Sequence, residues 1–576
     1  MALEDFPNHP IFKQLLEYVP LNDGIIIHDP EHGINANYAR FLNDVLELRR
    51  TIREQIPDLL DSNGIVRNDG VYICTLAPAS YEFFVAAFAI WAVGAALSPL
   101  ATGIIPKEAV YLFEKSKAVL LIASSGQRDA AAEYQRCMKE ETGNTIKTIG
   151  VDLTIPTPST PPNYHIDERA VIPAARPMLL ILTSGTTGPP KGVVRLVVPL
   201  NIRAMLKATN DDLTLCHRAI HWGFGIGPPI SMLLSGLAIY VVGADPSPEM
   251  IWTALRQKKL TVAFATNLTF LRLMQYYNEH IANLEPDVVK EYTDGVRKLK
   301  YVACGGAVPM PSVGQFWKDM RGGHPITILY GTSEAGAALG TPPEGYDVTQ
   351  RVIGKPLPGV QVKLSEGDHG EMLLKGPDLF VGYLNNEAAT KAALDENGYY
   401  KTGDLVHIDE NGNYIVDGRV KEDFVRSRTL KVGTLELEDK LSDLPYISEA
   451  AVIAVPDIEI LHRVGVIARL KSGTTSDGTD QDGQPVNMLY KIRRDLTEMK
   501  VEQYKLPTLL RVLKDDEIIP RTTTDKVIRK KVLEIFFPQS ADCRVEDLPK
   551  EVLAWDIKND KKAGSTGLWD WAGAQD

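Results

Sequence analysis

Short apolar segments alternate with longer segments of helical spacing from about residue 70 to residue 420. Four of the apolar segments are rich in β-branched or aromatic residues and predict buried strands at 71–76, 178–183, 299–304 and 326–331. Strands that alternate with helices indicate parallel sheets with both faces covered. Ligands in such folds bind at loops that leave the carboxyl ends of strands. Polar, glycine-rich motifs follow several of these strands directly, so we expect the functional site there.

The most apolar stretch of the chain runs from Phe83 to Leu100, contains many alanines and is interrupted by Gly94 and Pro99. A membrane-spanning helix needs about 20 steadily apolar residues. We therefore predict a buried helix that leads into a short strand, and no membrane span.

The pattern changes after about residue 360, where two segments with Asn-Gly and Gly-Asp turns predict antiparallel hairpins. A smaller α+β pattern follows. The expected fold class is α/β, with a large domain over 1–418 that combines parallel sheets, flanking helices and a small β-barrel-like part. A small α+β domain is expected over 419–545, and a partly disordered tail over 546–576.

The composition is that of a globular protein, with 44% hydrophobic and 24% charged residues, and 576 residues are enough for two or more domains. The net charge is −12 and the pI is near 5.5. Nucleic acids and anionic membranes attract a positive field, so we expect no nucleic-acid partner. The five cysteines are scattered without a CxxC pair, which predicts neither a disulfide framework nor a zinc site.

Neither end of this sequence shows a recognisable targeting signal. The first ten residues, MALEDFPNHP, have acidic residues where a signal peptide has basic ones. The last six, WAGAQD, contain no peroxisomal or prenylation motif. The cytoplasm is the expected compartment.

The strongest local motif is TSGTTGPPKG at 183–192, directly after a predicted strand. Its four hydroxyl side chains, its glycines and its lysine offer many donors on a flexible backbone, which is the chemistry needed to surround a polyphosphate. It is not a Walker A loop, because Lys191 follows Pro190 and precedes Gly192. A merely flexible Ser/Thr/Gly loop is the alternative, and the remaining motifs of the chain decide against it.

Five further motifs follow this loop: GGA at 305–307, YGTSE at 330–334, YKTGD at 400–404, DGRVKE at 417–422 and PRTTTDK at 520–526. Together with the loop they resemble the motifs of the acyl-adenylate-forming (AMP-binding) enzymes, and most of all the acyl- and aryl-CoA ligases. The similarity spans roughly residues 70 to 535. It implies that a carboxylate attacks the α-phosphorus of ATP, that pyrophosphate leaves, and that the acyl group then passes to an acceptor. It also implies a mobile small domain that carries the catalytic lysine.

The resemblance assigns the nucleotide contacts. The phosphates are expected at Thr183, Ser184, Gly185, Thr186, Thr187, Gly188 and Lys191. Adenine and ribose are expected at Gly305, Gly306, Ala307, Tyr330, Gly331, Thr332, Asp404 and Arg419, with Tyr330 stacked on adenine and Asp404 bonded to the ribose hydroxyls.

The resemblance also assigns the catalytic group, which consists of Lys526, His221, Ser333 and Glu334. Glu334 would hold Mg²⁺, a cation that prefers carboxylate oxygen. Ser333 would bond the α-phosphate, and Lys526 would bridge that phosphate and the attacking carboxylate. Singly, each carboxylate could be solvated or cap a helix, and Lys526 could belong to a solvated basic face. Their order along the chain favours function.

The segment HWGFG at 221–225 falls where the family carries an aromatic-rich wall beside the acid site; the alternative for His221 is a core histidine. The segment 220–230 contains no carboxylate that could pair with an ammonium group, so an α-amino acid substrate is not expected. Its aromatic residues and glycines favour an aryl or medium acyl group. Residues 351–364 resemble malonate-activating relatives, but these usually carry an arginine where Leu329 stands, so a dicarboxylic acid is not expected.

Coenzyme A is the expected acceptor. The family lines the thiol tunnel with a Gly-rich loop, whereas residues 426–431 contain no glycine here, and Asp525 replaces the usual glycine before the lysine. Both departures indicate an altered tunnel. A carrier-protein thiol or a free amine therefore stays open as the acceptor. A non-catalytic nucleotide-binding relative is a further alternative, although Glu334 and Lys526 are both present.

Overall fold

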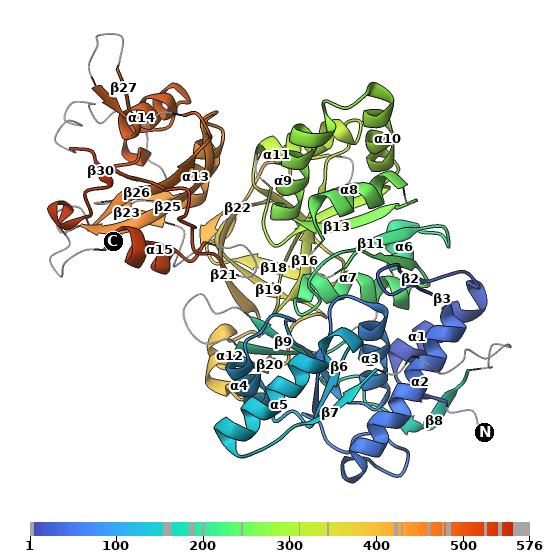
Figure 1. Ribbon diagram of the computed structural model, residues 1–576. Coiled ribbons are helices and arrows are strands. Elements are labelled where there is room, and N and C mark those ends of the chain that lie inside the picture. Colours follow the sequence, from blue (N-terminus) through green and yellow to red (C-terminus); the bar gives the residue numbers. More distant parts are fainter. Residues whose placement is uncertain are drawn as a thin grey trace.

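The computed structural model describes a large body and a smaller unit that lies to one side of it, coloured orange to red in Figure 1. The described residues are 5–151, 153, 164–183, 191–197, 202–243, 246–257, 259–309, 311–342, 345–419, 424–427, 430–457, 461–474, 477–479, 485–522, 527–538 and 544–556.

The first sheet of the large body has seven strands, and its central strands are parallel. The edge next to β9 is different, because the chain turns back there and β10 pairs with β9 antiparallel. The order is β20 (Gly382–Tyr383), β10 (Lys191–Arg195), β9 (Leu179–Thr183), β5 (Ala96–Pro99), β4 (Tyr72–Leu76), β6 (Leu120–Ala123) and β7 (Lys147–Gly150).

The second sheet has thirteen strands, parallel from β2 to β15 and antiparallel beyond. The antiparallel part contains the two hairpins expected after residue 360. The order is β18 (Gln361–Leu364), β19 (His369–Lys375), β21 (Tyr400–Ile408), β22 (Tyr414–Arg419), β17 (Val352–Pro356), β16 (Gly336–Gly340), β15 (Thr327–Thr332), β14 (Tyr301–Gly305), β13 (Val262–Thr266), β11 (Leu213–Cys216), β12 (Ala238–Val241), β2 (Ile27–Asp29) and β3 (Ile34–Ala36).

Helices cover these sheets, and Figure 1 shows α8 to α11 grouped beside the second sheet and α4 and α5 beside the first. The predicted α/β class is therefore confirmed, and all four predicted buried strands are present as β4, β9, β14 and β15. The helices of the large body are α1 (Pro10–Tyr18), α2 (Tyr38–Gln55), α3 (Tyr81–Ala92), α4 (Pro106–Ser116), α5 (Arg128–Thr142), α6 (Ile202–Leu206), α7 (Gly223–Leu234), α8 (Pro248–Gln257), α9 (Asn267–Tyr276), α10 (Pro286–Arg297), α11 (Pro311–Met320) and α12 (Glu387–Ala393).

Helix α3 lies in the centre of the body, with every one of its residues buried. Ser80 begins the helix by accepting a hydrogen bond from the Phe83 N–H at 3.3 Å. Its buried Glu82 carboxylate accepts from the Ser125 N–H at 2.8 Å. Gly94, with φ 76°, ends the turn that leads into β5. The prediction of a buried helix followed by a short strand is confirmed.

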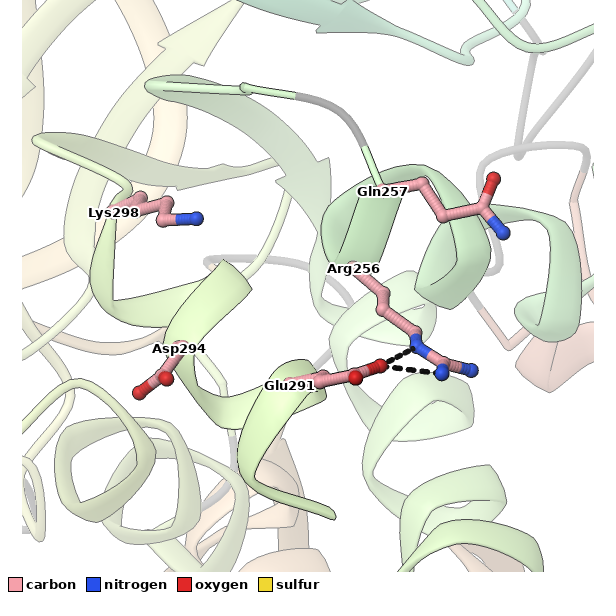
Figure 2. Close-up of a pocket in the computed structure, with 5 residues that line it drawn as sticks. All are labelled: Arg256, Gln257, Glu291, Asp294 and Lys298. Carbon is pink, nitrogen blue, oxygen red and sulfur yellow. Dashed lines mark hydrogen bonds and ion pairs between the residues drawn. The ribbon is translucent and has the colours of Figure 1, made fainter. Parts of the chain in front are cut away.

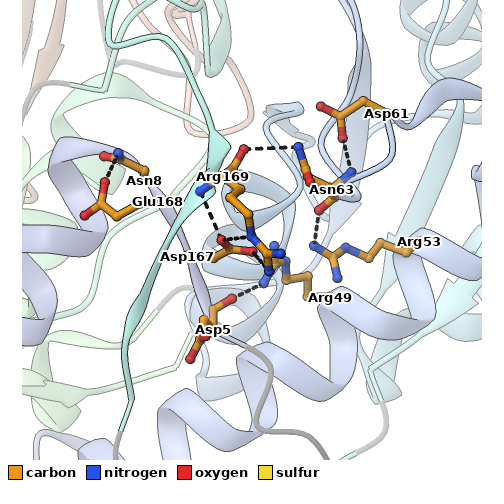
Figure 3. A network of polar contacts seen from close by, with 9 residues as sticks. All are labelled: Asp5, Asn8, Arg49, Arg53, Asp61, Asn63, Asp167, Glu168 and Arg169. Atoms are coloured by element: carbon orange, nitrogen blue, oxygen red, sulfur yellow. Dashed lines mark hydrogen bonds and ion pairs between the residues drawn. The ribbon is translucent and has the colours of Figure 1, made fainter.

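The start of the chain is fixed to the body by a parallel pair of short strands, β1 (Phe6–Asn8) and β8 (Ile166–Val171). Polar contacts reinforce this pair (Figure 3). Arg49 of α2 donates to the Asp5 carbonyl at 2.6 Å, and the Asn63 amide donates to the Arg169 carbonyl at 3.1 Å. This network joins distant segments and lies away from the glycine-rich motifs, so we interpret it as structural.

The smaller unit contains one six-stranded sheet of β24 (Leu430–Gly433), β23 (Phe424–Ser427), β26 (Leu461–Leu470), β29 (Leu509–Val512), β30 (Val552–Ala554) and β25 (Ile447–Asp457). Its helices are α13 (Thr434–Ser442), α14 (Met488–Glu498) and α15 (Arg529–Phe536), and a short hairpin joins β27 (Asp477–Thr479) to β28 (Pro485–Asn487). Strand β30 lies beyond the predicted boundary at residue 545, yet it pairs with β29 inside this sheet. The fold of the unit thus continues at least to residue 554.

Within the part of the chain that the structure describes, no helix is both long and apolar enough to cross a membrane. Of the predicted disordered tail, residues 557–576 lie outside the described residues.

Candidate functional site

The predicted phosphate loop joins two antiparallel strands of the first sheet. Thr183, the last residue of β9, stands opposite Lys191, the first residue of β10, and the Thr183 hydroxyl donates to the Lys191 carbonyl at 3.2 Å. The two ends of the predicted loop are therefore held together. The residues between them, including the predicted contacts Ser184, Gly185, Thr186, Thr187 and Gly188, lie outside the described residues.

Tyr383 connects the predicted phosphate residue Lys191 to the predicted metal ligand Glu334. The Lys191 ammonium group lies 4.8 Å from the centroid of the Tyr383 ring, a cation–π distance. The Tyr383 hydroxyl donates to Oε1 of Glu334 at 2.8 Å. Burial, together with the neighbouring Glu334 carboxylate, raises the pKa of Tyr383, so this hydroxyl stays a donor.

The second carboxylate oxygen of Glu334 is available for a cation. Oε2 accepts no hydrogen bond from the described residues, whereas Oε1 is fixed by Tyr383. The main chain of Glu334 is also fixed, because its carbonyl accepts from the Phe380 N–H at 2.6 Å. A carboxylate held at one oxygen and free at the other suits a hard divalent cation.

The predicted adenine and ribose residues meet directly, because the Tyr330 hydroxyl bonds Oδ2 of the Asp404 carboxylate. Tyr330 lies in β15 and Asp404 in β21, 74 positions later in the sequence. The backbone N–H of buried Asp404 donates to the Thr402 hydroxyl at 3.0 Å, which fixes the strand at that point. Arg419 stands opposite Asp404 in the β21–β22 pair. The structure thus brings three predicted nucleotide residues to one place, although the Arg419 side chain lies outside what is described.

The GGA motif forms the end of β14 and the turn after it. A Cβ on Gly305 would lie 2.6 Å from the Phe224 ring, so a side chain there would force that ring to move. Gly306 has φ 87°, a conformation that favours glycine. The Cys304 thiol donates to the Ala307 carbonyl at 3.4 Å and closes the turn. Both glycines are therefore favoured by the local geometry.

The YGTSE motif spans the end of β15 and a tight turn into β16. A Cβ on Gly331 would lie 2.2 Å from the Gly336 carbonyl oxygen. The Thr332 hydroxyl accepts from the Ala335 N–H at 3.1 Å, so it holds the turn. Ser333 and Glu334 lie in the turn and are partly exposed.

The predicted acid-site segment lies at the start of α7, next to the GGA turn. The rings of His221 and Trp222 meet edge to face with 5.0 Å between their centroids. Burial lowers the pKa of His221 to about 4, so the imidazole is neutral at pH 7. A Cβ on Gly225 would overlap the Ala219 carbonyl, which explains the glycine there. Phe224 reaches Gly305, so this segment and the nucleotide motifs share one wall.

The catalytic lysine of the prediction cannot be placed, because Lys526 lies outside the described residues. Its flanking residues are described, and Arg521 and Val527 form an antiparallel bridge in the smaller unit.

A polar contact joins the two units. The guanidinium of Arg351 in the large body makes two bonds to the Asp439 carboxylate of α13, at 2.6 and 2.9 Å.

A surface depression between α8 and α10 is a separate feature (Figure 2). Its lining is Arg256, Gln257, Glu291, Asp294 and Lys298, and the charges partly cancel, because Arg256 donates to Glu291 at 2.6 Å. It contains none of the predicted site residues.

Four of the cysteines are free thiols: Cys74, Cys137, Cys216 and Cys304. No cluster of metal-ligating side chains occurs in the described part of the chain.

Two residues of the site were not found from the sequence. Tyr383 follows an apolar segment and has no local feature that separates it from a core tyrosine. Arg218 stacks on Phe224 beside the acid segment, and only the fold of residues 218–225 brings the two together. No pattern in the sequence indicates either contact.

The fold and the contacts indicate an α/β nucleotide-binding enzyme, with candidate site residues from both sheets. A family profile described as AMP-binding enzyme matches residues 53–384, more than half of the chain. The chain belongs to this family, as the sequence motifs predicted.

Curated relatives cover almost the whole chain. The acyl-CoA ligase OryP of Aspergillus oryzae is 34% identical over 97% of this chain and 98% of its own length. The mitochondrial malonate–CoA ligase ACSF3 of Homo sapiens is 28% identical, with 92% of each chain covered. The ATP-bound crystal structure of MatB from Rhodopseudomonas palustris matches with a TM-score of 0.72 at 21% identity over 91% of this chain and 98% of that one. It supports the same fold.

Proposed function

We propose that this chain is an AMP-forming acid–coenzyme A ligase. It activates a carboxylic acid as the acyl-adenylate, with release of pyrophosphate, and transfers the acyl group to coenzyme A. The relatives named as acyl-CoA and malonate–CoA ligases support this activity. The single observation that carries it in the structure is that the YGTSE motif makes two contacts, Tyr330 with Asp404 and Glu334 with Tyr383.

The proposed nucleotide site combines the two sheets. The triphosphate would lie along the 183–191 hairpin loop, with Lys191 at its end. Adenine would stack on Tyr330 beside the GGA turn, and the ribose hydroxyls would donate to Asp404. Supporting this arrangement, the Thr183–Lys191 pair, the GGA turn and Tyr330 lie at or next to strand ends, and Tyr330 bonds Asp404.

Glu334 would hold Mg²⁺ through Oε2, the oxygen that no described residue occupies. Bound there, the cation would neutralise charge on the triphosphate oxygens. Tyr383 fixes the other oxygen and so limits the orientations of the carboxylate. This orienting role is the kind that outer residues of metal sites commonly have.

In the first half-reaction a carboxylate oxygen of the acid attacks the α-phosphorus, and the bond from that phosphorus to the leaving pyrophosphate oxygen breaks. Both reacting groups are anions, so cations and donors near them lower the barrier. Ser333 would donate to the α-phosphate from the turn after β15. Lys526 would bridge the α-phosphate and the attacking carboxylate from the smaller unit. In the second half-reaction the thiol attacks the acyl carbon and AMP leaves.

The acid is a small carboxylic acid, in line with the named relatives. We propose that its body is aryl or medium acyl and that it is not an α-amino acid. The wall offers the rings of Trp222 and Phe224 and a neutral His221. No carboxylate occurs among residues 220–230 to receive an ammonium group.

Coenzyme A is the proposed acceptor, and none of the named relatives supports a carrier protein. The cytoplasm stays a prediction, since the human relative is named as mitochondrial.

The decisive test of the proposed function is pyrophosphate release over a panel of acids, with and without coenzyme A, and mass spectrometry of the products. The acyl-adenylate without coenzyme A and the acyl thioester with it are the expected products. Release of ADP, or no release with any acid, would contradict the proposal.

A further inference from the structure

Arg218 is a cation without a carboxylate partner in the described part of the chain. Its Nη1 donates to the Phe224 carbonyl at 2.9 Å, and its guanidinium carbon lies 3.8 Å from the centroid of the Phe224 ring. Its closest electrostatic neighbours are the thiols of Cys216 and Cys304. A neutral carbonyl, a ring and two thiols do not neutralise a positive charge.

Placing an arginine there has a cost. Burial lowers the pKa of Arg218 to about 9, which means that the surroundings destabilise the charged form. Buried charges are normally paired, because removing a lone ion from water is unfavourable. A charge that is retained without a partner on its own chain is a candidate for pairing with a ligand.

Two other arginines show that the chain can satisfy such groups. Arg195, also beside the acid segment, pairs with Asp378 at 3.1 Å and donates to its carbonyl at 3.2 Å. Arg321 also has no carboxylate partner among the described residues, but its two terminal nitrogens donate to the carbonyls of His324, Pro325 and Leu299. Arg218 has one such acceptor, although a guanidinium has five N–H donors. The residue is partly exposed, so a ligand could reach its remaining nitrogens.

The position of Arg218 is that of the proposed acid site. It follows β11, whose neighbour β13 pairs with β14, and all three strands are parallel. The ring of Phe224, on which the guanidinium lies, abuts Gly305. Gly305 in turn pairs with Leu329, directly before Tyr330. The free N–H groups therefore lie in the same wall as the aromatic residues of the acid segment.

We infer that Arg218 binds a second carboxylate on the acid substrate, so the enzyme activates dicarboxylic acids with an apolar middle section. This rests on the proposed function. A guanidinium matches a carboxylate through two parallel hydrogen bonds, and the neighbouring Phe224 and Trp222 rings suit the apolar section. The expectation against a dicarboxylic acid rested on Leu329, and Arg218 supplies a positive charge from the segment after β11 instead.

The test compares acids that differ only in the second carboxylate: succinate with butyrate, adipate with hexanoate, and terephthalate with benzoate. Pyrophosphate release by the wild-type enzyme gives kcat/KM for each acid. We expect at least one dicarboxylate to exceed its monoacid partner by about 10²-fold, because a buried charge left unpaired strongly disfavours the analogue that lacks its partner. Arg218→Met should remove this preference by slowing the dicarboxylate about 10²-fold while the monoacid changes little. Arg218→Lys should restore part of it.

Arg195→Met is the matched control. Its charge is already neutralised by Asp378, so both members of each pair should change by the same factor. A wild-type enzyme that prefers the monoacid in all three pairs overturns the inference, and this comparison requires no variant to fold. Equal losses for both acids in Arg218→Met also overturn it. In both cases pyrophosphate release with monoacids leaves the proposed function intact. If none of the acids gave pyrophosphate release, the proposed function itself would be contradicted.

Discussion

The large body and the smaller unit contribute to the site in different ways. In the large body the predicted nucleotide residues Tyr330 and Asp404 already touch, and Tyr383 bonds the predicted metal ligand Glu334. These contacts join strands that are fixed in two extended sheets. The smaller unit is attached through the chain after Arg419 and through polar contacts such as that between Arg351 and Asp439. Its predicted contribution, Lys526, depends on where the whole unit lies.

We therefore predict that one half of the site is formed by folding and that the other half depends on the position of the smaller unit. Preformed groups can bind a nucleotide without further ordering. A group delivered by a separate unit can act in one half-reaction and leave in the next. Substitutions in the two regions should therefore separate nucleotide binding from chemistry.

The largest effect is expected for Lys526→Ala. Loss of a well-aimed cation should slow adenylation by about 10²-fold or more and leave ATP binding by the large body nearly unchanged. Pyrophosphate exchange measures the rate, and equilibrium binding of ATP measures the affinity. Lys530→Ala is the control, since Lys530 is exposed in the same basic run. A near wild-type exchange rate in Lys526→Ala would mean that the lysine is misassigned.

Tyr383→Phe should give a smaller effect with a different signature. It removes the hydroxyl bond to Glu334 and keeps the ring beneath Lys191. We expect the Mg²⁺ concentration needed for half-maximal rate to rise about 10-fold, the usual size for loss of an outer partner of a metal ligand. Tyr399→Phe, which loses a bond to Gln361, is the control. Identical Mg²⁺ dependence in both variants would exclude Tyr383 as a positioning residue.

The sequence predicted most of what is local. Buried strands followed from short β-branched segments, and the motif glycines followed from family similarity; Gly305 and Gly331 allow close packing in the structure. What could not be predicted depends on long-range pairing. Tyr383 reaches Glu334 across 49 positions, and its strand joins the first sheet beside β10. Arg218 lies only six positions from Phe224, but its importance comes from having no carboxylate partner among the described residues, which only the packed structure reveals.

A third prediction tests the contact that connects the two units. Arg351→Ala removes two bonds to Asp439 and one to the Leu435 carbonyl at 3.0 Å. Both side chains are partly exposed, so we expect about a threefold to tenfold increase in protease cleavage just after Arg419, and little change in melting temperature. Adding Asp439→Ala to Arg351→Ala should increase protease cleavage little further, because the two residues stabilise the contact as a pair. Arg494→Ala, whose ion pair lies within α14, should leave cleavage unchanged. Equal cleavage in all variants would show that this pair does not hold the units together.

The smallest effect concerns two histidines whose pKa values are shifted in opposite directions. Burial lowers the pKa of His221 to about 4 from 6.5, so the unfolded chain binds a proton that the folded chain does not, and stability is lost as the pH falls from 6.5 toward 4. The hydrogen bond to Asp417 raises the pKa of His407 on β21. Its contribution is therefore complete below pH 6.5 and is lost as the pH rises through the raised pKa.

The His407 side chain is 39% exposed, so solvent screens its contact with Asp417, which is 2.8 Å away. We expect His407→Gln to lower the melting temperature by about 2 °C at pH 6 and not at pH 9, whereas His221→Gln should reduce the loss of stability between pH 6.5 and pH 4. Thermal melts of both variants across this range measure the two slopes. If His407→Gln lowered the melting temperature equally at pH 6 and pH 9, its contribution would come from packing, and the charge interaction with Asp417 would play no part.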